Sequence, residues 1–142
     1  MSDNEDQIAN ILSRYRMAVL DKDVEGMMEL YADDIRVFDT WGVWTHDGIA
    51  AWRQVVEHWF GSLKDEIVKV VFDDVRTERG SDLAVVSAVT TYTAVSANGE
   101  ELRSMQNRVT RSLVRRADLW KIVHEHSSAP IRFEDMKAIL MR

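Results

Sequence analysis

Two of the four histidines, His124 and His126, lie two positions apart near the end of the sequence. In a β-strand the side chains of residues i and i+2 point to the same face, so both imidazoles are expected to continue the apolar face of Trp120 and Ile122. Imidazoles titrate near neutral pH, which suits acid–base chemistry. They could instead supply two metal ligands, with Asp39 as a third, or bond neighbours and help to close a pocket. We expect no metal, because an H-x-H pair alone is a weak metal signal.

Asp39 is the leading candidate for a general base. It ends a short alternating segment, on the same face as Ile35 and Val37. A carboxyl group that continues an apolar face enters a less polar setting, which raises its pKa and makes it a better base near neutral pH. The structural alternative is that Asp39 begins a loop and caps the turn toward Trp41, which is a common place for aspartate.

The spacing of apolar residues indicates which elements position these side chains. Three segments have helical periodicity, and most of the remaining chain forms β-branched runs separated by turn residues. Helices are expected at Asp6–Leu20, at Val24–Tyr31 with Asp23 as its cap, and from a cap at Asp47 to Phe60. Strands are expected at Ile35–Asp39, Ile67–Arg76, Leu83–Ser96, Glu101–Arg115 and Leu119–Ser127, and a short C-terminal helix at Phe133–Met141.

Helices that are segregated from a mainly antiparallel sheet predict an α+β fold. The length of 142 residues suits a single domain, 1–142. The sequence is 46% hydrophobic and 30% charged, as is typical of soluble globular proteins. It has no apolar run long enough to span a membrane, and its acidic N-terminus is unlike a signal peptide, so we expect a cytoplasmic protein that does not bind membranes.

Composition also excludes several kinds of chemistry. The chain has no cysteine, so thiolate catalysis and disulfides are ruled out. It has no glycine-rich phosphate loop, and no organic cofactor is expected. A net charge of -6 with dispersed basic residues argues against nucleic-acid binding. Seven methionines and five tryptophans are generous for this length, and they suit a lined cavity or a partner surface.

Two segments carry a resemblance to a known superfamily. They read S-R-Y-R-M-A-V-L-D-K-D-V-E-G-M-M-E-L-Y-A-D-D-I-R-V-F-D and R-V-T-R-S-L-V-R-R-A-D-L-W-K-I-V-H-E-H-S-S, and D-G-I-A-A-W begins a helix between them. The chain resembles the nuclear transport factor two-like superfamily, in particular its SnoaL-like and ketosteroid-isomerase-like branch. The resemblance covers nearly the whole domain. It implies a cystatin-like, cone-shaped fold in which a curved, mainly antiparallel sheet wraps around the N-terminal helices and leaves a deep apolar pocket.

The resemblance implies roles for two of the candidate residues. Asp39 falls where ketosteroid isomerases carry the base that moves a proton beside a carbonyl group. Tyr15 falls where they use a tyrosine to donate a hydrogen bond to the developing enolate oxygen, although a tyrosine on a helix stripe is also an ordinary core residue. Fold alone does not fix function, because members of this superfamily include isomerases, cyclases, dehydratases, hydrolases and association domains.

One departure from the isomerases concerns their second donor, a protonated acid on the penultimate strand. Its position falls near Thr110, and no acid lies between Leu102 and Asp118. Steroid isomerisation is therefore not expected, although Arg108 on the same face could stabilise an anion. If that face is concave, His124 and His126 lie with these two residues across the hairpin.

The expected site thus consists of two sets of residues. The catalytic set is Asp39, Tyr15 and His124. The substrate-binding set is Trp41, Tyr31, Arg108, Thr110 and His126, with Trp41 on a loop that should border the pocket mouth. The corresponding function is general acid–base chemistry on a mostly apolar, carbonyl-containing small molecule. The alternative is a non-catalytic, dimeric ligand-binding or association module.

Dimerisation is expected in either case, since members of the superfamily commonly pair through the outer face of the sheet. The strand Leu83–Ser96 has apolar residues on both faces, which fits a core on one side and a partner on the other. Coverage of the outer face by the C-terminal helix is the alternative.

Overall fold

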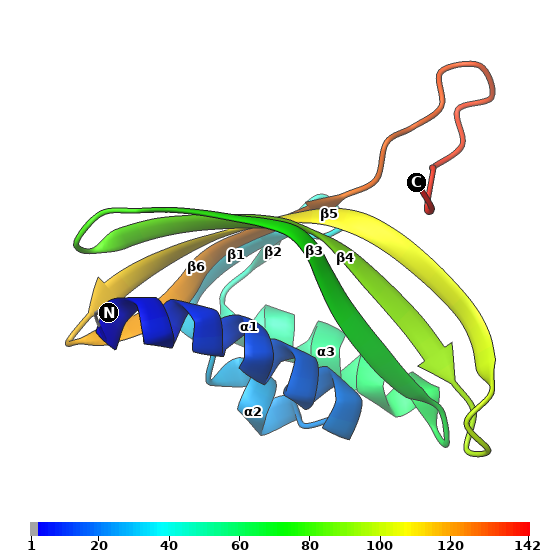
Figure 1. Ribbon diagram of the computed structural model, residues 1–142, viewed down its shortest axis with the longest axis horizontal. Helices are drawn as coiled ribbons and strands as arrows, with labels where there is room; N and C mark the ends of the chain where they lie inside the picture. The colour runs from blue at the N-terminus through cyan, green and yellow to red at the C-terminus, as the bar shows by residue number, and fades with distance from the viewer. Residues whose placement is uncertain (1–2) are drawn as a thin grey trace.

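The computed structural model describes residues 3–142, with side chains from Gln7 onward, and shows a curved sheet arched over helices (Figure 1). Within these residues the helices are α1 (Asp3–Asp21), α2 (Val24–Met28) and α3 (Ile49–Leu63). The strands are β1 (Tyr31–Phe38), β2 (His46–Asp47), β3 (Ile67–Arg79), β4 (Leu83–Val95), β5 (Glu101–Arg116) and β6 (Leu119–Ser128). The α+β fold expected from the sequence is therefore confirmed, with four strands within a few residues of their expected ends.

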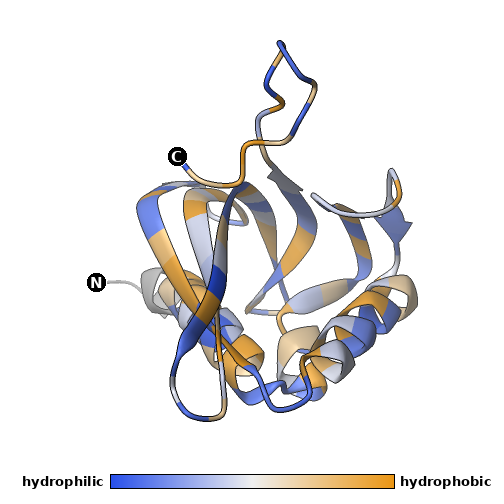
Figure 2. Cartoon of the chain, turned by 90° about the vertical axis from the view of Figure 1, so that its right-hand side faces the viewer, coloured by the Kyte–Doolittle hydropathy of each residue, from blue (hydrophilic) through white to orange (hydrophobic). Residues whose placement is uncertain are grey.

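The six strands form one mixed sheet in the order β2-β1-β6-β5-β4-β3. All neighbouring pairs are antiparallel except β1 and β6, which run parallel. The helices lie against the concave face, and Figure 2 shows from the side how the sheet curls around them, with hydrophobic and hydrophilic residues alternating along the strands. Because β1 and β6 are parallel neighbours, their C-terminal ends meet at the same edge of this concave face.

Helices α1 and α3 pack on the sheet, and α2 packs against both of them. On α1 the buried residues recur at helical spacing: Ile8, Ile11, Tyr15, Ala18 and Val19. Helix α2 begins at Val24, and Asp23 caps it as expected from the sequence, with its side chain accepting from the backbone N–H of Gly26. The expected Asp47 cap is wrong, because α3 starts from Gly48, which has a φ of 89° and makes no side-chain cap. No helix among the described residues is long and apolar enough to cross a membrane.

The C-terminal helix expected at 133–141 is also wrong. The segment leaves the sheet after β6 and projects from the body (Figure 1), with Ile131 bridged to Ala138 in antiparallel fashion. Its end returns to β5, where the backbone N–H of Gln106 donates to the carbonyl of Leu140 at 2.6 Å. Phe133 is 86% exposed. Because short helices need tertiary packing to be stable, this segment has no reason to become helical.

A bulge in β6 decides which side chains point inward. Ser112 of β5 pairs with His124, whereas the next residue, Leu113, pairs with Ile122, so Val123 is an extra residue. Trp120 and Ile122 are buried before the bulge, and Glu125 and Ser127 are buried after it. The prediction that Trp120, Ile122, His124 and His126 share one face is therefore wrong, because the bulge turns both histidines to the outer face.

Candidate active site

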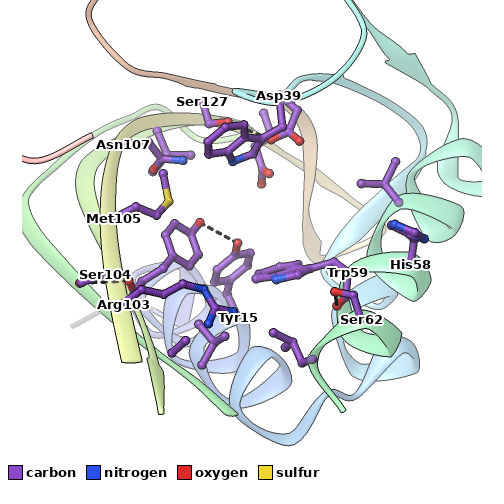
Figure 3. A pocket seen from close by; sticks show the side chains of 18 of the residues that line it. Tyr15, Asp39, His58, Trp59, Ser62, Arg103, Ser104, Met105, Asn107 and Ser127 are labelled. Atoms are coloured by element: carbon purple, nitrogen blue, oxygen red, sulfur yellow. Dashed lines mark hydrogen bonds between the residues drawn. The ribbon is translucent and has the colours of Figure 1, made fainter. Parts of the chain in front are cut away.

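A cavity of about 470 Å³ lies between the concave face of the sheet and helices α1 and α3 (Figure 3). Most of its wall is aromatic or aliphatic, and the rings come from Tyr15, Trp41, Trp52, Trp59 and Tyr92. The polar and charged side chains of the wall are Asp39, His58, Ser62, Arg103, Ser104, Asn107, Glu125 and Ser127. Figure 3 shows Asp39, Ser127 and Asn107 on one side of the cavity and Tyr15 on the opposite side.

Asp39 follows the last residue of β1 and lines the cavity. Burial raises the pKa of its carboxyl group, and the negative charge of Glu125 adds to this, while the hydrogen bond from Ser127 acts in the opposite direction. Ser127 Oγ donates to Asp39 Oδ1 at 3.1 Å. The parallel pairing of β1 with β6 explains this contact, since both residues lie at the ends of neighbouring strands. Asp39 is thus a fixed carboxyl group with raised basicity.

Two tyrosines share a hydrogen bond at the bottom of the cavity. The hydroxyl oxygens of Tyr15 and Tyr92 are 3.0 Å apart (Figure 3). Burial raises the pKa of both, so both phenols are neutral near pH 7. Each of the two tyrosine hydroxyls has one proton, and the hydrogen bond between them takes up only one of these two protons. The other proton is available to an oxygen atom in the cavity.

Next to the tyrosines lies a buried ion pair that the sequence did not predict, and its acid, Glu125, also lines the cavity. Nε of Arg111 donates to Glu125 Oε1 at 2.7 Å, and the hydroxyl of Tyr31 donates to the same oxygen at 2.6 Å. The Arg111 guanidinium also lies 4.4 Å above the ring of Tyr15. Burial is the largest single influence and would lower the pKa of Arg111, but Glu125 together with Tyr31, Tyr15 and Tyr92 outweighs it, so the net pKa is raised. The ion pair therefore holds Tyr15 and Tyr31 in place and stays charged.

The expected site residues divide between two sides of the sheet. Asp39, Tyr15 and Trp41 line the cavity. Tyr31 is buried against Glu125 and is not part of the cavity wall. The other four, His124, His126, Arg108 and Thr110, do not line the cavity either.

These four residues lie on the outer face because of strand alternation and the bulge. Thr110 is paired with His126 in the hairpin, as the sequence suggested, but the inward residues of β5 are Asn107, Val109 and Arg111. His124 Nδ1 instead contacts the carbonyl oxygen of Arg36 at 2.8 Å. The condition for these four residues to meet a substrate, that their face is concave, is therefore not met.

The same arrangement bears on the metal alternative. Asp39 and the two histidines lie on opposite faces of the sheet, so they cannot share one ion. Among the described residues, no group of three or more histidine, cysteine, aspartate or glutamate side chains is placed to hold a metal.

Several residues of the site were missed by the sequence reasoning: Tyr92, Asn107, Arg111, Glu125 and Ser127. The sequence of β5 did contain a signal for two of them. Asn107 and Arg111 lie on the same face of the strand as the apolar residues Val109 and Leu113. A polar residue at an apolar position of a strand is buried and needs a partner. For Glu125 and Ser127 the regular alternation pointed to the wrong face.

Comparison with known proteins agrees with the fold. A family model described as a SnoaL-like domain matches residues 8–132. No curated protein matches the sequence significantly. The solved structure of an NTF2-like protein of unknown function from Pseudomonas putida is 26% identical, with 98% of this chain and 95% of that chain covered and a TM-score of 0.86.

Two further solved structures share the fold at lower identity. One, from Streptomyces avermitilis, is provisionally named a dehydratase from the NTF2-like family; it is 16% identical, with 89% and 97% of the two chains covered and a TM-score of 0.73. The other, from Xanthomonas campestris, is provisionally named a calcium/calmodulin dependent protein kinase II association domain; it is 22% identical, with 87% and 85% covered and a TM-score of 0.73. Because the family model spans most of the chain and the cavity, sheet and helices agree with this fold, the protein belongs to the SnoaL-like domain family.

Proposed function

We propose that the protein is an enzyme that performs general acid–base chemistry on a mostly apolar, carbonyl-containing small molecule. The observation that carries this proposal is Asp39, a carboxyl group with a raised pKa in a cavity whose surface is mostly apolar. Such a group is a better base near neutral pH than an exposed aspartate. The provisional dehydratase name of the Streptomyces avermitilis relative is in keeping with proton transfer of this kind.

The proposed reaction starts with the substrate carbonyl oxygen against the Tyr15–Tyr92 pair. Asp39 removes a proton from the carbon next to the carbonyl, and the electron pair of that C–H bond moves toward the oxygen. The free tyrosine proton stabilises the enolate by a hydrogen bond that is stronger to the anion than to the neutral ketone. In a substrate with a neighbouring C=C bond, Asp39 then returns the proton to a different carbon of the conjugated enolate, which gives isomerisation. In a substrate with a hydroxyl on the next carbon, the enolate electrons expel hydroxide as the C–O bond breaks, and Asp39 gives it the proton, which yields water and dehydration.

Proton exchange tests the base without knowledge of the natural substrate. β-Tetralone has acidic protons beside its carbonyl group, and in heavy water the protein should catalyse their replacement by deuterium, as measured by proton NMR. Asp39→Asn keeps the shape of the side chain but cannot take a proton, so exchange should slow by about 100-fold or more. Asp47→Asn, at an exposed position, is the matched control and should exchange at the wild-type rate. Undiminished exchange by Asp39→Asn would refute the assignment.

The same fold could also serve association, and one observation favours a homodimer through the outer sheet face. Leu83 and Val85 on β4 are exposed there, as are Phe133 and Met136 on the projecting C-terminal segment. Light scattering should then report twice the chain mass of 16.4 kDa. Val85→Glu should weaken the dimer, whereas Met17→Glu on the exposed side of α1 should not. A monomeric wild type would contradict this proposal.

A further inference from the structure

The cavity wall contains a cation near the start of β5. Among the described residues that line the cavity, Arg103 is the only arginine or lysine. It pairs across the sheet with Ala94 of β4, which is buried and also lines the cavity. Side chains that face each other across two antiparallel strands lie on the same face of the sheet. Arg103 therefore belongs to the inward face, and Figure 3 shows its side chain extending inward from β5 on the side of the cavity away from Asp39.

The alternation along β5 leads to the same placement. Met105, Asn107 and Val109 follow Arg103 at intervals of two, and all three line the cavity. The side chain of Arg103 is 61% exposed, unlike that of Asn107 or Val109, which are buried. Arg103 thus lies where the cavity opens to solvent, and a molecule in the cavity can reach its guanidinium group.

The guanidinium group uses little of its bonding capacity within the chain. Arg103 Nη2 donates to Glu66 Oε1 at 2.6 Å, and no other group of the described residues accepts a hydrogen bond from it. A guanidinium group has five N–H donors in a planar fork, so most of them remain for solvent or a ligand. Exposed ion pairs contribute little to stability, because water competes for both charges. Glu66 therefore holds Arg103 at the opening without saturating it.

The neighbouring hydroxyl groups of the wall donate their protons elsewhere. Ser62 Oγ donates to the carbonyl oxygen of Trp59 at 2.7 Å, and Ser104 Oγ is within 3.1 Å of the carbonyl oxygen of Tyr92, to which it donates. An anion at this end of the cavity would thus find its donors on Arg103. At the other end the ionised carboxyl group of Asp39 would repel it.

We infer that the substrate carries an anionic group, such as a carboxylate, that binds Arg103 at the opening of the cavity. The inference rests on the proposed function, because the other end of the same molecule lies at Asp39. The substrate class is thus a carbonyl compound with an apolar, ring-containing body and a carboxylate. A planar guanidinium group can bind a carboxylate through two parallel hydrogen bonds, which fixes direction as well as position. Arg103 would therefore decide which end of the substrate enters first.

Binding of matched probes tests this inference. The probes are β-tetralones with a carboxymethyl group at each open position of the aromatic ring, each paired with its neutral amide of nearly the same shape. Trp41, Trp52 and Trp59 line the cavity, so tryptophan fluorescence reports binding. At low salt the wild type should bind at least one acid about fivefold more tightly than its amide, as expected when a hydrogen bond becomes charge-assisted. The preference should shrink as added salt screens the charges.

Substitutions at two matched ion pairs locate the cation. Arg103→Met keeps the apolar part of the side chain but removes the charge, so the preference for the acid should disappear. Arg103→Lys keeps the charge without the planar fork and should retain part of the preference. Glu66→Gln removes the competing carboxylate and should retain or increase it. The control is Arg53→Met, which breaks an exposed pair with Glu25 that is also 2.6 Å long and lies outside the cavity wall. This control should show the wild-type preference.

Circular dichroism of each variant confirms that the fold is intact, and Arg103→Gln replaces the methionine variant if that variant does not fold. A wild type that binds no acid more tightly than its amide overturns the inference. So does a preference that survives the loss of charge at Arg103. An equal loss of preference in Arg53→Met also overturns it, because the overall charge of the protein would then decide binding.

The outcomes also separate this inference from the proposed function. Asp39→Asn should slow proton exchange while the preference for the acid still depends on Arg103. Undiminished exchange by Asp39→Asn, with the preference still dependent on Arg103, overturns the base assignment and leaves the anion subsite standing. Slowed exchange by Asp39→Asn together with a wild type that has no preference overturns the subsite and leaves the base standing.

Discussion

The buried ion pair between Arg111 and Glu125 leads to a direct prediction about stability. The bonded atoms are 2.7 Å apart, and the side chains are 2% and 6% exposed. Taking both charges out of water is costly, and their attraction offsets that cost only while both are present. A variant that removes one charge leaves the other buried and uncompensated.

Glu125→Gln keeps the shape of the side chain and an oxygen that can accept from Arg111 and Tyr31, but it removes the negative charge. We expect the free energy of unfolding to fall by about 3–5 kcal/mol. A domain of this kind is stable by roughly 5–15 kcal/mol, so the loss is a large fraction of the total. At about 2–4 °C per kcal/mol, the melting temperature should fall by roughly 6–20 °C.

Urea unfolding at neutral pH, followed by tryptophan fluorescence and circular dichroism, measures the change. The double variant Arg111→Met/Glu125→Leu should recover most of the lost stability, since apolar replacement of a buried pair is often nearly neutral. The control is Glu29→Gln, which breaks the exposed pair with Arg14 at 3.1 Å and should cost about 0.5 kcal/mol or less. A loss in Glu125→Gln no greater than in this control would refute the reasoning.

Three further predictions concern the cavity. Burial raises the pKa of Asp39, so the folded protein favours the protonated carboxyl group. The stability that this proton provides is fully present below the usual aspartate pKa and is lost as the pH rises through the raised pKa. Asp39→Asn should therefore melt at a higher temperature than the wild type at neutral pH, and the difference should disappear on acidification. Wild-type β-tetralone exchange should rise with pH through the same raised pKa. Tyr92→Phe should slow exchange about tenfold while Tyr15 still donates, and His126→Ala on the outer face should leave it within about twofold. Differential scanning calorimetry checks the first prediction, and NMR exchange rates check the others; equal rates for Tyr92→Phe and wild type would contradict the role of the tyrosine pair.

Much of the fold was predictable because its apolar pattern is regular. The stripe on α1 follows one helical period, and the β-branched runs of β3, β4 and β5 alternate over most of the residues that pack on the core. Asp39 was expected in a less polar setting because it continues an apolar face, whereas Tyr15 was expected at the site only from the family resemblance; both line the cavity. Asp39 shows how far this reasoning extends, because its environment could be inferred from the positions of Ile35 and Val37 alone.

The remainder depends on tertiary packing that a local pattern does not encode. Val123 is an ordinary strand residue, and nothing in its neighbours predicts that the strand bulges there. The partners of Glu125 are Arg111 and Tyr31, which are 14 and 94 residues away in the chain. The segment after Pro130 was expected to be helical, but most of its apolar residues are exposed: Ile131, Phe133, Met136 and Met141.

The bulge at Val123 also has a consequence for how the final hairpin chooses its pairing. A one-residue slip of a strand exchanges its two faces, and Trp120 and Ile122 alone would allow β6 to continue without a bulge. In that alternative His124 would point inward and Glu125 outward, and the buried guanidinium of Arg111 would lose its counter-charge. The ion pair thus disfavours the competing register, and the carboxylate that anchors the tyrosines also keeps the imidazoles out of the cavity.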